Sequence, residues 1–398
     1  MPEYIYKSPT SFKTLSLENL QEGLEGVYIR QLSSTQGYQI RKPLFLEDPD
    51  RAGFLKEVHF RRIYYANPFV LSLKNIQLIG VASYLTEKHE WFNDYHYVNE
   101  DQLNADLELL ADFTNPYHNG WTQFHPTSRK EVFSKKDQDR SEVFLRGKTL
   151  VLCSQEPDVF GSWIFRILPK LNAAQRLELK YDQILIEPHE RLIEYFELMG
   201  VDPRLIVKHN RYYSYKLEHA IIPSLQNSQL YLDDETQQFY STLRQKFGGV
   251  RLEGNKLFVS RRKHASVNMN YRVLKNEEEL EQALLKEGFI SVYPEHLSVK
   301  DQIKFFSSAS MIVGPSGSAL FNCVYCQPNV PIIDIESQPF HLDNHAALFS
   351  SYGVNYGFLA GFPDPLDKRP VHRNWTVNIP ALIACVRNIE SSFNPLSV

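Results

Sequence analysis

The chain has 398 residues, 43% of them hydrophobic and 23% charged, with a formal net charge of -4. This length exceeds what one ordinary core buries, so we expect two α/β domains. The charge balance gives no support for nucleic-acid binding, which needs a concentrated basic surface. The N-terminus lacks a signal-peptide core, and no run of about 18 uncharged apolar residues predicts a spanning helix. We therefore expect a cytoplasmic protein, in which any membrane contact would be peripheral.

Cysteine usage is low, which indicates free thiols in a reducing compartment. The cysteines are Cys153, Cys323, Cys326 and Cys385. Cys323 and Cys326 form a CxxC pair, but neither a second pair nor a histidine pair follows to complete a zinc site. A redox role is the alternative. Because the pair lies in an apolar segment, we expect both thiols to be buried.

Residues 1–145 carry short aromatic and β-branched runs, which predict a mixed region with some strands. The polar stretch from about 88 to 142 is interpreted as loops. From residue 148 strands and helices alternate, which predicts a parallel sheet covered by helices. This first array has expected strands at 148–153, 183–186, 205–207 and 220–222, and helices at 163–174 (with a kink or fresh start at Pro169), 189–199 and 233–247.

A second array begins near residue 257. Its expected strands are 257–260, 289–293, 311–314 and 331–335, and its expected helices begin at Asn276 in a capping box with Glu279, at Ser298, and after the loop at 314–318. We expect two Rossmann-like domains facing a cleft, hinged near Gly248-Gly249, with an extra mixed N-terminal region. The expected domains are 1–248, 249–345 and a helical segment 346–398 that packs back on the N-terminal domain.

Functional groups follow the strands of the second array, at the edge where open α/β sheets bind ligands. Arg261 and Arg262 follow its first strand, and Glu336 follows its last. Between them lies Gly314-Pro315-Ser316-Gly317-Ser318-Ala319, whose small residues let a ligand approach backbone N–H groups at a helix start. Arginine forks suit phosphate oxygens, and a carboxylate suits ribose hydroxyls. Together these features predict a nucleoside-diphosphate site, although each alone also fits an ordinary surface or turn role.

Several of these segments resemble, in order, the pattern of glycosyltransferase family 61. They are Ser260-Arg261-Arg262, Asn270-Tyr271-Arg272 with Asn276-Glu277, Gln302-Ile303 before Ala309, Gly314 to Leu320 with Asn322, and Ile333-Asp334-Ile335-Glu336. The resemblance is ordered from about 256 to 336, weaker from 148 to 250 and in the tail, and absent from the first hundred residues.

The resemblance implies a GT-B architecture and inverting, metal-independent transfer of a sugar without a cofactor. The implied donor is a nucleoside-diphosphate sugar, a UDP-sugar being favoured. The implied acceptor is a glycan or lipid-linked glycan in capsule or lipopolysaccharide synthesis, which would bring the protein to the inner membrane. Implied donor-binding residues are Arg261, Arg262, Ser316, Gly317, Ser318, Ala319, Asn322 and Glu336. No DxD metal motif is evident, because Asp233-Asp234 is better explained as a helix cap.

The first array departs from the family pattern, since Ser162 and Arg166 stand where a histidine and an acid are common. An inverting transferase needs a base for the acceptor hydroxyl. Asp158 and His189 follow strands and are the candidates, although capping or surface roles fit them as well. The departures also motivate an alternative, a catalytically silent nucleotide-sugar-binding partner in a synthesis complex. A non-glycosyl Rossmann enzyme is disfavoured because no GxGxxG follows an expected strand. We expect Gly317→Val mainly to block the phosphate pocket, with some backbone strain.

Overall fold

The computed structural model describes a set of ranges that excludes several loops. They are 3–32, 38–47, 62–63, 67–95, 101, 103–105, 123–127, 132–135, 140–226, 231–250, 252–262, 272–337, 342–369 and 373–393. The chain forms two compact units. The first comprises Met1–Gly37 and Tyr64–Ser228, and the second Tyr38–Ile63 and Gln229–Val398. The division therefore falls upstream of the expected hinge at Gly248-Gly249, and part of the N-terminal region belongs to the second unit.

The described strands of the first unit form one mixed sheet of eleven strands. Four neighbouring strands run parallel, in the spatial order β13 (Ile206–Lys208), β12 (Gln183–Ile186), β11 (Glu142–Val151) and β14 (Ser214–Pro223). The first of these strands along the chain, β11, thus lies between β12 and β14. The long strand β6 (Phe69–Ile79) then pairs with β14 in the antiparallel sense.

Most strands of the N-terminal region extend this same sheet. Beyond β6 the sheet continues through β7 (Ser83–Leu85), β8 (Glu90–Phe92), β1 (Tyr4–Tyr6), β10 (Val132–Lys135) and β9 (Phe124–Pro126), and β2 (Gly26–Ile29) also pairs with β6. Buried side chains of β6, β11 and β14 share one hydrophobic core, which explains why the two segments fold together. The interpretation of 88–142 as loops is wrong in part, because β8, β9 and β10 lie in this stretch and pair in the sheet; much of the rest lies outside the described residues.

The helices of the first unit include one segment of unusual winding. They are η1 (Pro9–Ser11), α1 (Leu17–Glu22), α4 (Phe160–Ser162), the π-helix η3 (Trp163–Ile167), α5 (Leu168–Arg176), α6 (Glu194–Leu198) and η4 (Pro203–Leu205). Pro169 lies just after the π-helical segment within one continuous helical run from Phe160 to Arg176, so the fresh start expected at Pro169 is not found. The helix expected over 189–199 is wrong in extent. It is reduced to α6, and turns precede it.

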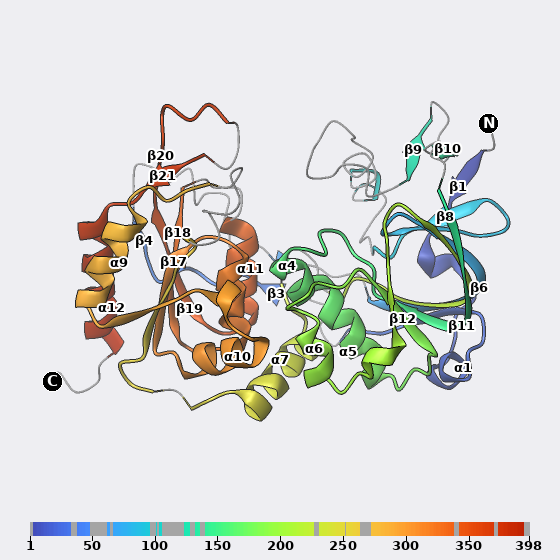
Figure 1. Ribbon diagram of the computed structural model, residues 1–398, viewed down its shortest axis with the longest axis horizontal. Coiled ribbons are helices and arrows are strands. Elements are labelled where there is room, and N and C mark those ends of the chain that lie inside the picture. The colour runs from blue at the N-terminus through green and yellow to red at the C-terminus, as the bar shows by residue number, and fades with distance from the viewer. Residues whose placement is uncertain are drawn as a thin grey trace. The chain divides into compact units, whose positions relative to one another are not determined.

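The second unit is built on a parallel sheet of six described strands (Figure 1). Their spatial order is β16 (Phe289–Val292), β15 (Lys256–Val259), β17 (Met311–Pro315), β18 (Pro331–Glu336), β19 (Asn355–Ala360) and β4 (Leu46–Glu47). Among the strands of the second array, the first along the chain, β15, lies between β16 and β17, so the order reverses between β15 and β17. Open α/β sheets bind ligands at the carboxyl ends beside such a reversal.

Helices cover both faces of this sheet. Figure 1 shows α9 (Glu277–Lys286) and α12 (Ile379–Phe393) on one side, and α10 (Val299–Ser308) and α11 (Leu342–Ser351) on the other. Further elements are β3 (Tyr38–Gln39), β5 (Arg62–Ile63), α7 (Asp234–Phe247), η5 (Pro294–His296), η6 (Ser318–Tyr325), β20 (Phe362–Pro363) and β21 (Trp375–Thr376). The tail helix α12 shares a core with α9 and the sheet, so it belongs to this unit.

Two of three expected helix caps are confirmed. Ser298 accepts a hydrogen bond from Asp301 N, and Asp233 accepts one from Thr236 N. The capping box at Asn276 is wrong, because its side chain makes no cap bond to α9. Instead it exchanges two hydrogen bonds with the backbone of Val377, at 2.9 and 3.1 Å. This long-range pairing competes with the local cap and ties α9 to the segment that precedes α12.

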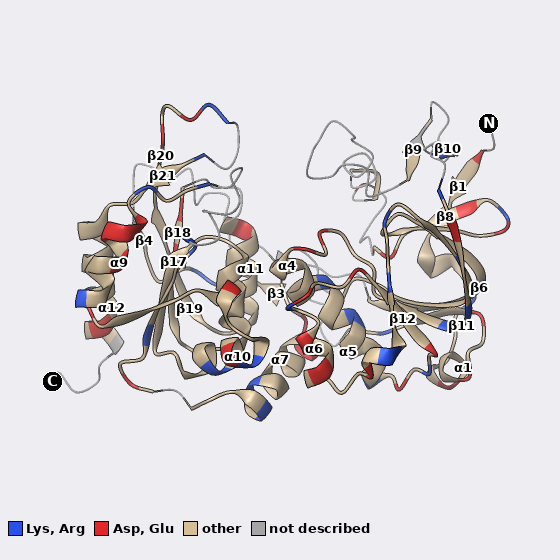
Figure 2. Cartoon of the chain, in the orientation of Figure 1, with Lys and Arg blue, Asp and Glu red and all other residues tan. Residues whose placement is uncertain are grey.

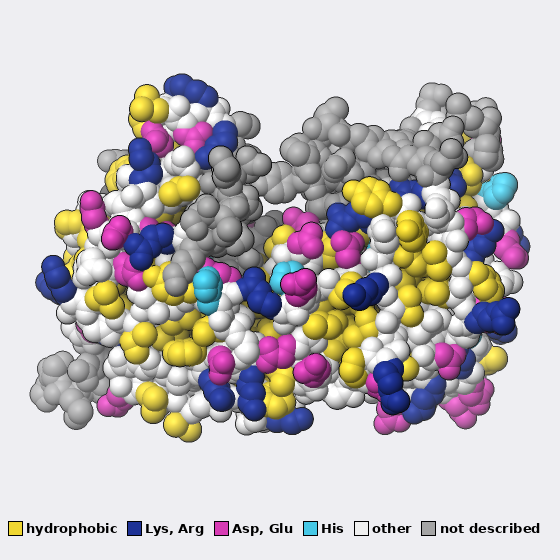
Figure 3. Space-filling view, viewed as in Figure 1, with side chains coloured by type: hydrophobic (Ala, Val, Ile, Leu, Met, Phe, Trp, Pro, Cys, Tyr) yellow, Lys and Arg dark blue, Asp and Glu magenta, His cyan; other side chains and the backbone are white. Residues whose placement is uncertain are grey.

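The four cysteines are free, and Cys323 and Cys326 are buried as predicted. Burial raises the pKa of Cys323 well above its ordinary value, so its thiol stays protonated. Positively and negatively charged residues are interspersed along both units (Figure 2), and on the face shown in Figure 3 charged side chains alternate with apolar ones. None of the helices in the described ranges is long and apolar enough to span a bilayer.

Candidate functional site

The candidate donor site begins at the turn that follows β15, where Glu277 holds the backbone. Oε1 of this buried carboxylate accepts hydrogen bonds from Ser260 Oγ at 2.7 Å, Arg261 N at 2.8 Å and Arg262 N at 3.1 Å. Burial raises the pKa of Glu277, and these hydrogen bonds oppose the shift. Because Glu277 is the first residue of α9, the helix that follows β15 fixes the direction in which Arg261 leaves the strand.

Two buried arginines converge on one carbonyl group at the switch point of the sheet. Arg261 Nη1 and Arg272 Nη2 both donate to the carbonyl oxygen of Ser316, the latter at 2.6 Å. Their exposed fractions are 9% and 7%. Ser316 N in turn donates to Ile335 O at 2.8 Å, which fastens the loop to β18. Two guanidinium groups are thus held beside the loop that the sequence indicates for a diphosphate.

Arg272 is the principal site residue that sequence reasoning missed. It belongs to the family pattern, but its position in the sequence indicates no role, and its neighbours 270 and 271 lie outside the described residues. Its Nη1 donates to Glu336 Oε1 at 2.7 Å, and Glu336 is fully buried. We therefore revise the expectation for Glu336. Its carboxylate lies beneath the site and orients Arg272, an arrangement that does not present it to a ribose.

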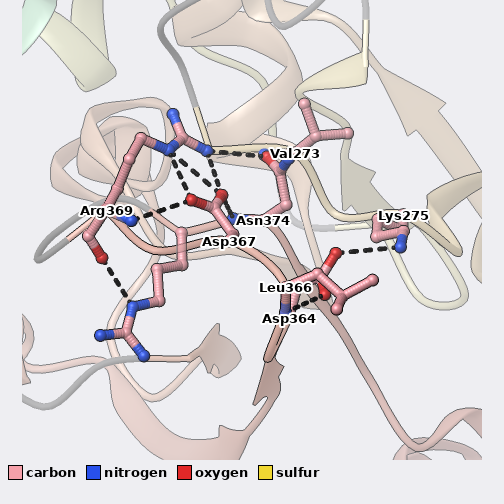
Figure 4. Close-up of polar contacts among 8 residues, drawn as sticks. Val273, Lys275, Asp364, Leu366, Asp367, Arg369 and Asn374 are labelled. Carbon is pink, nitrogen blue, oxygen red and sulfur yellow. Dashed lines mark hydrogen bonds and ion pairs between the residues drawn. The ribbon is translucent and has the colours of Figure 1, made fainter.

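A polar hairpin holds the segment that carries Arg272 (Figure 4). Val273 O accepts from Trp375 N at 2.9 Å, and Val273 N donates to Asn374 Oδ1 at 2.9 Å. Leu274 forms a parallel bridge with Trp375, which is the first residue of β21. Within the hairpin, Asp367 accepts hydrogen bonds from the backbone N–H of Asn374 and from its ion-pair partner Arg369.

The loop after β17 has a backbone that requires glycine. Gly317 has φ 148° and ψ 176°, a region that only glycine adopts readily. A β-carbon on Gly317 would also lie 1.9 Å from Arg261 Nη1 and 2.7 Å from its Cζ. The positive φ that the sequence suggests for this glycine is present. The space beside it holds the guanidinium of Arg261, so a side chain at this position would disturb both the backbone and that arginine directly. That Gly317→Val also blocks a ligand stays a prediction.

The other predicted donor residues differ in accessibility. Gly317, Ser318 and Ala319 are partly exposed and begin η6, a 3-10 helix where the sequence predicts an ordinary helix start. The first N–H groups of a helix have no partner within it, so they remain suited to an anion. Asn322 is fully buried and donates to Ala319 O at 3.1 Å, which supports the loop from inside.

Arg262 has its charge committed elsewhere. Its Nη2 lies 2.8 Å from Glu281 Oε2, and its Nη1 lies 3.6 Å from Glu278 Oε2. Its side chain is 42% exposed, in contrast to that of Arg261. Arg262 is therefore a weaker candidate for phosphate binding than Arg272.

The predicted catalytic candidates lie at strand ends of the first unit. Asp158 is exposed in the loop after β11, and His189 is half-buried after β12. The charge of Asp158 acts on the pKa of His189, so the two lie near each other. Burial and the charge of Arg191 lower the pKa of His189, which favours the neutral imidazole.

The hydrogen bonds of His189 weaken its candidacy as a base. Its Nδ1 accepts from Arg191 N at 3.3 Å and from Leu192 N at 3.4 Å, which is a capping role. In the neutral ring the proton then resides on Nε2, which donates rather than accepts. Asp158 carries no such restriction and is the better placed of the two.

The positions where this chain departs from the family pattern form one cluster. Arg166 Nη1 donates to Ser162 Oγ at 2.8 Å and lies 3.1 Å from Glu156 Oε2. Glu156 has φ 49°, an uncommon conformation for a residue with a side chain. Arg166 belongs to the π-helix η3, and such segments are frequent at functional sites. The loop after β11 thus supplies a second carboxylate, Glu156, which sequence reasoning did not single out.

A buried histidine lies at the end of β13 in the same unit. His209 Nε2 lies 2.9 Å from Gly80 O, and its Nδ1 lies 3.8 Å from Glu187 Oε2. Burial alone would lower the pKa of His209, but Cys153 and Glu187 together raise it to about 9. Glu187 also pairs with Arg211 at 2.8 Å.

Within the described ranges, no three His, Cys, Asp or Glu side chains are grouped to hold a metal ion. The second unit is an open parallel α/β sheet that holds two buried arginines and a glycine-dependent loop at its switch point, features that suit an anionic ligand.

Comparison with known proteins identifies the family to which this part of the chain is similar. Residues 160–333 match the model of the family described as Glycosyltransferase 61, so this stretch carries a glycosyltransferase 61 domain. The domain runs from α4 into β18 and includes Arg261, Arg272 and the loop at Ser316. It implies an enzyme that transfers sugar between a donor and an acceptor. None of the curated proteins compared with the chain matches it.

Proposed function

We propose that the protein transfers a sugar from a nucleoside-diphosphate sugar, with a UDP-sugar favoured, to a glycan or lipid-linked glycan acceptor. The proposal includes a GT-B arrangement of the two units, inversion at the anomeric carbon, and no metal. It also places the reaction in surface polysaccharide synthesis, in the capsule or lipopolysaccharide class, on the cytoplasmic side of the inner membrane. The convergence of Arg261 and Arg272 on the carbonyl of Ser316 is the observation that carries it.

In the proposed reaction the acceptor hydroxyl oxygen attacks the anomeric carbon of the donor. The bond from that carbon to the β-phosphate oxygen breaks, and the nucleoside diphosphate leaves with the electron pair. Asp158 takes the hydroxyl proton. Arg261, Arg272 and the amides of the loop at Gly317 to Ala319 stabilise the charge on the leaving diphosphate, which is the task a metal performs in other transferases.

A matched arginine pair tests the donor half of this proposal. Arg261→Ala removes a charged hydrogen bond, worth about 1.5–3 kcal/mol, so nucleoside-diphosphate binding should weaken roughly 10- to 150-fold. Arg262→Ala is the control, because its charge pairs with Glu281 and Glu278. Titration calorimetry with UDP, GDP, dTDP and ADP measures both. Equal affinities for the parent and Arg261→Ala would remove Arg261 from the site.

The alternative is a catalytically silent nucleotide-sugar-binding partner in a synthesis complex. Arg166 favours it, because the position where the family commonly has an acid holds a cation tied to Ser162 and Glu156. Turnover of a donor panel with glycan acceptors separates the two functions. Release of nucleoside diphosphate that Asp158→Asn abolishes, with donor binding intact, supports the transferase. Donor binding without transfer or hydrolysis supports the silent partner.

A further inference from the structure

Ser316 is fixed from a second side by a buried histidine and aspartate. Its Oγ lies 3.2 Å from His345 Nδ1, and the same Nδ1 lies 2.5 Å from Asp334 Oδ2. Asp334 is in β18 and fully buried, and His345 is on α11 and 3% exposed. Asp334 and His345 both lie beyond residue 333, where the family match ends.

The geometry excludes a nucleophilic relay. In a relay of serine, histidine and aspartate, one ring nitrogen contacts the serine and the other contacts the carboxylate. Here both contacts are made by Nδ1, so the ring cannot pass a proton from the hydroxyl of Ser316 toward Asp334. The ring instead packs edge-on against Phe321 and Phe349, at 5.1 and 5.9 Å between centroids. These contacts hold the ring in a fixed position behind the loop.

Ser316 thereby connects His345 to both arginines. Its side chain meets His345, its carbonyl receives Arg261 and Arg272, and its N–H is bonded to β18. Ser316 is only 1% exposed, so its hydroxyl does not face a ligand directly. A shift of this residue would move the acceptor that both guanidinium groups share.

We propose that His345 and Asp334 are positioning residues for the donor phosphates. They lock Ser316 so that its carbonyl holds Arg261 and Arg272 in the geometry that receives the diphosphate. This inference rests on the proposed function, because it assigns the determinants of affinity within the same donor site. It extends that site to α11, an element that supplies no predicted ligand-binding residue.

UDP affinity by titration calorimetry, with melting temperature measured in parallel, tests the inference on the full chain. Ser316→Ala removes the hydroxyl but leaves the pair of Asp334 and His345 intact, so it should fold normally. The net worth of one neutral hydrogen bond predicts about 2- to 13-fold weaker binding. His345→Phe keeps the ring contacts and deletes the nitrogen, and should weaken binding at least as much.

Conservative variants separate positioning from packing. The amide of His345→Asn can take the place of Nδ1, so its affinity should stay within about twofold of the parent, whereas His345→Gln places its amide where Nε2 lay and should not rescue. The double variant Ser316→Ala with His345→Phe should bind no more weakly than His345→Phe alone, since both changes break one linkage.

Two results overturn the inference in distinguishable ways. If the parent binds UDP and the folded variants Ser316→Ala and His345→Phe bind it equally well, the pair has no positioning role, while the proposed function stands. Lower melting temperatures with unchanged affinity lead to the same conclusion. If the parent binds none of UDP, GDP, dTDP and ADP, the proposed function itself fails, and this inference fails with it.

Discussion

Replacing Gly317 by alanine should disturb the proposed donor site through two separable causes. A β-carbon at φ 148° strains the backbone, at about 1–3 kcal/mol. The same carbon would lie 1.9 Å from Arg261 Nη1, so the guanidinium must leave Ser316 O. Loss of that charged hydrogen bond adds about 1.5–3 kcal/mol. Together they predict a loss of about 4 kcal/mol, or roughly 8–16 °C in melting temperature for a unit of this size.

Gly353→Ala provides the matched control within the same unit. Gly353 has φ 74°, but no atom outside its immediate neighbours lies within 4 Å of its β-carbon position. It should therefore suffer backbone strain alone, at about 1–2 kcal/mol. Differential scanning calorimetry compares the two variants, and UDP titration shows whether the displaced Arg261 also costs affinity.

The double variant Arg261→Ala with Gly317→Ala separates the causes further. With the guanidinium gone, the added methyl group has space, so the double variant should melt above Gly317→Ala alone. If Gly317→Ala melts like Gly353→Ala and binds UDP like the parent, Arg261 does not lie against Gly317. The loop would then not hold Arg261 in the contact described.

Three further outcomes are expected. Chelation by EDTA should leave transfer intact, and activity lost in EDTA but restored by manganese would refute metal independence. The pKa of His209 is raised to about 9, so the protonated ring stabilises the fold fully below about pH 6.5, and up to about 3 kcal/mol of stability is lost as the pH rises through 9. His209→Gln should flatten this fall in the free energy of unfolding measured by urea titration. His189→Gln should not, since the pKa of His189 is lowered. Lys170→Met should cost about 3–5 kcal/mol of unfolding free energy, because it leaves Asp94 buried without its partner. Lys216 is exposed, so Lys216→Met should cost under about 1 kcal/mol. Equal losses would contradict the burial argument.

Sequence periodicity predicts the elements that local chemistry determines. The strands β15 to β18 and the helices α7 and α10 are near their expected positions, and the caps Asp233 and Ser298 are confirmed. These features depend on residues only a few positions apart. The glycine requirement at Gly317 is likewise visible in the sequence, because small residues between an apolar strand and a helix predict an unusual turn.

Features that depend on distant residues were not predictable in the same way. Arg272 and Glu336 are 64 positions apart, and each separately looks like a surface charge. Asn276 satisfies a local capping pattern, yet its side chain bonds to the backbone of Val377 instead of to the N-terminus of α9. The antiparallel strand β6 joins the first unit's parallel strands only because it pairs with β14, a match between segments more than a hundred residues apart that no local period reveals.

The burial of Arg261 and Arg272 bears on how well the proposed donor site can distinguish between phosphate ligands. Arg261 and Arg272 share a carbonyl acceptor, and Glu336 neutralises one of the two charges. A guanidinium that is already desolvated and oriented gives up little hydration or side-chain entropy when a phosphate arrives, so more of the ion-pair energy remains as affinity. An exposed cation such as Arg262 loses more freedom for the same contact. Discrimination between a diphosphate and a monophosphate should therefore depend on the buried pair, and on the loop that keeps its two members together.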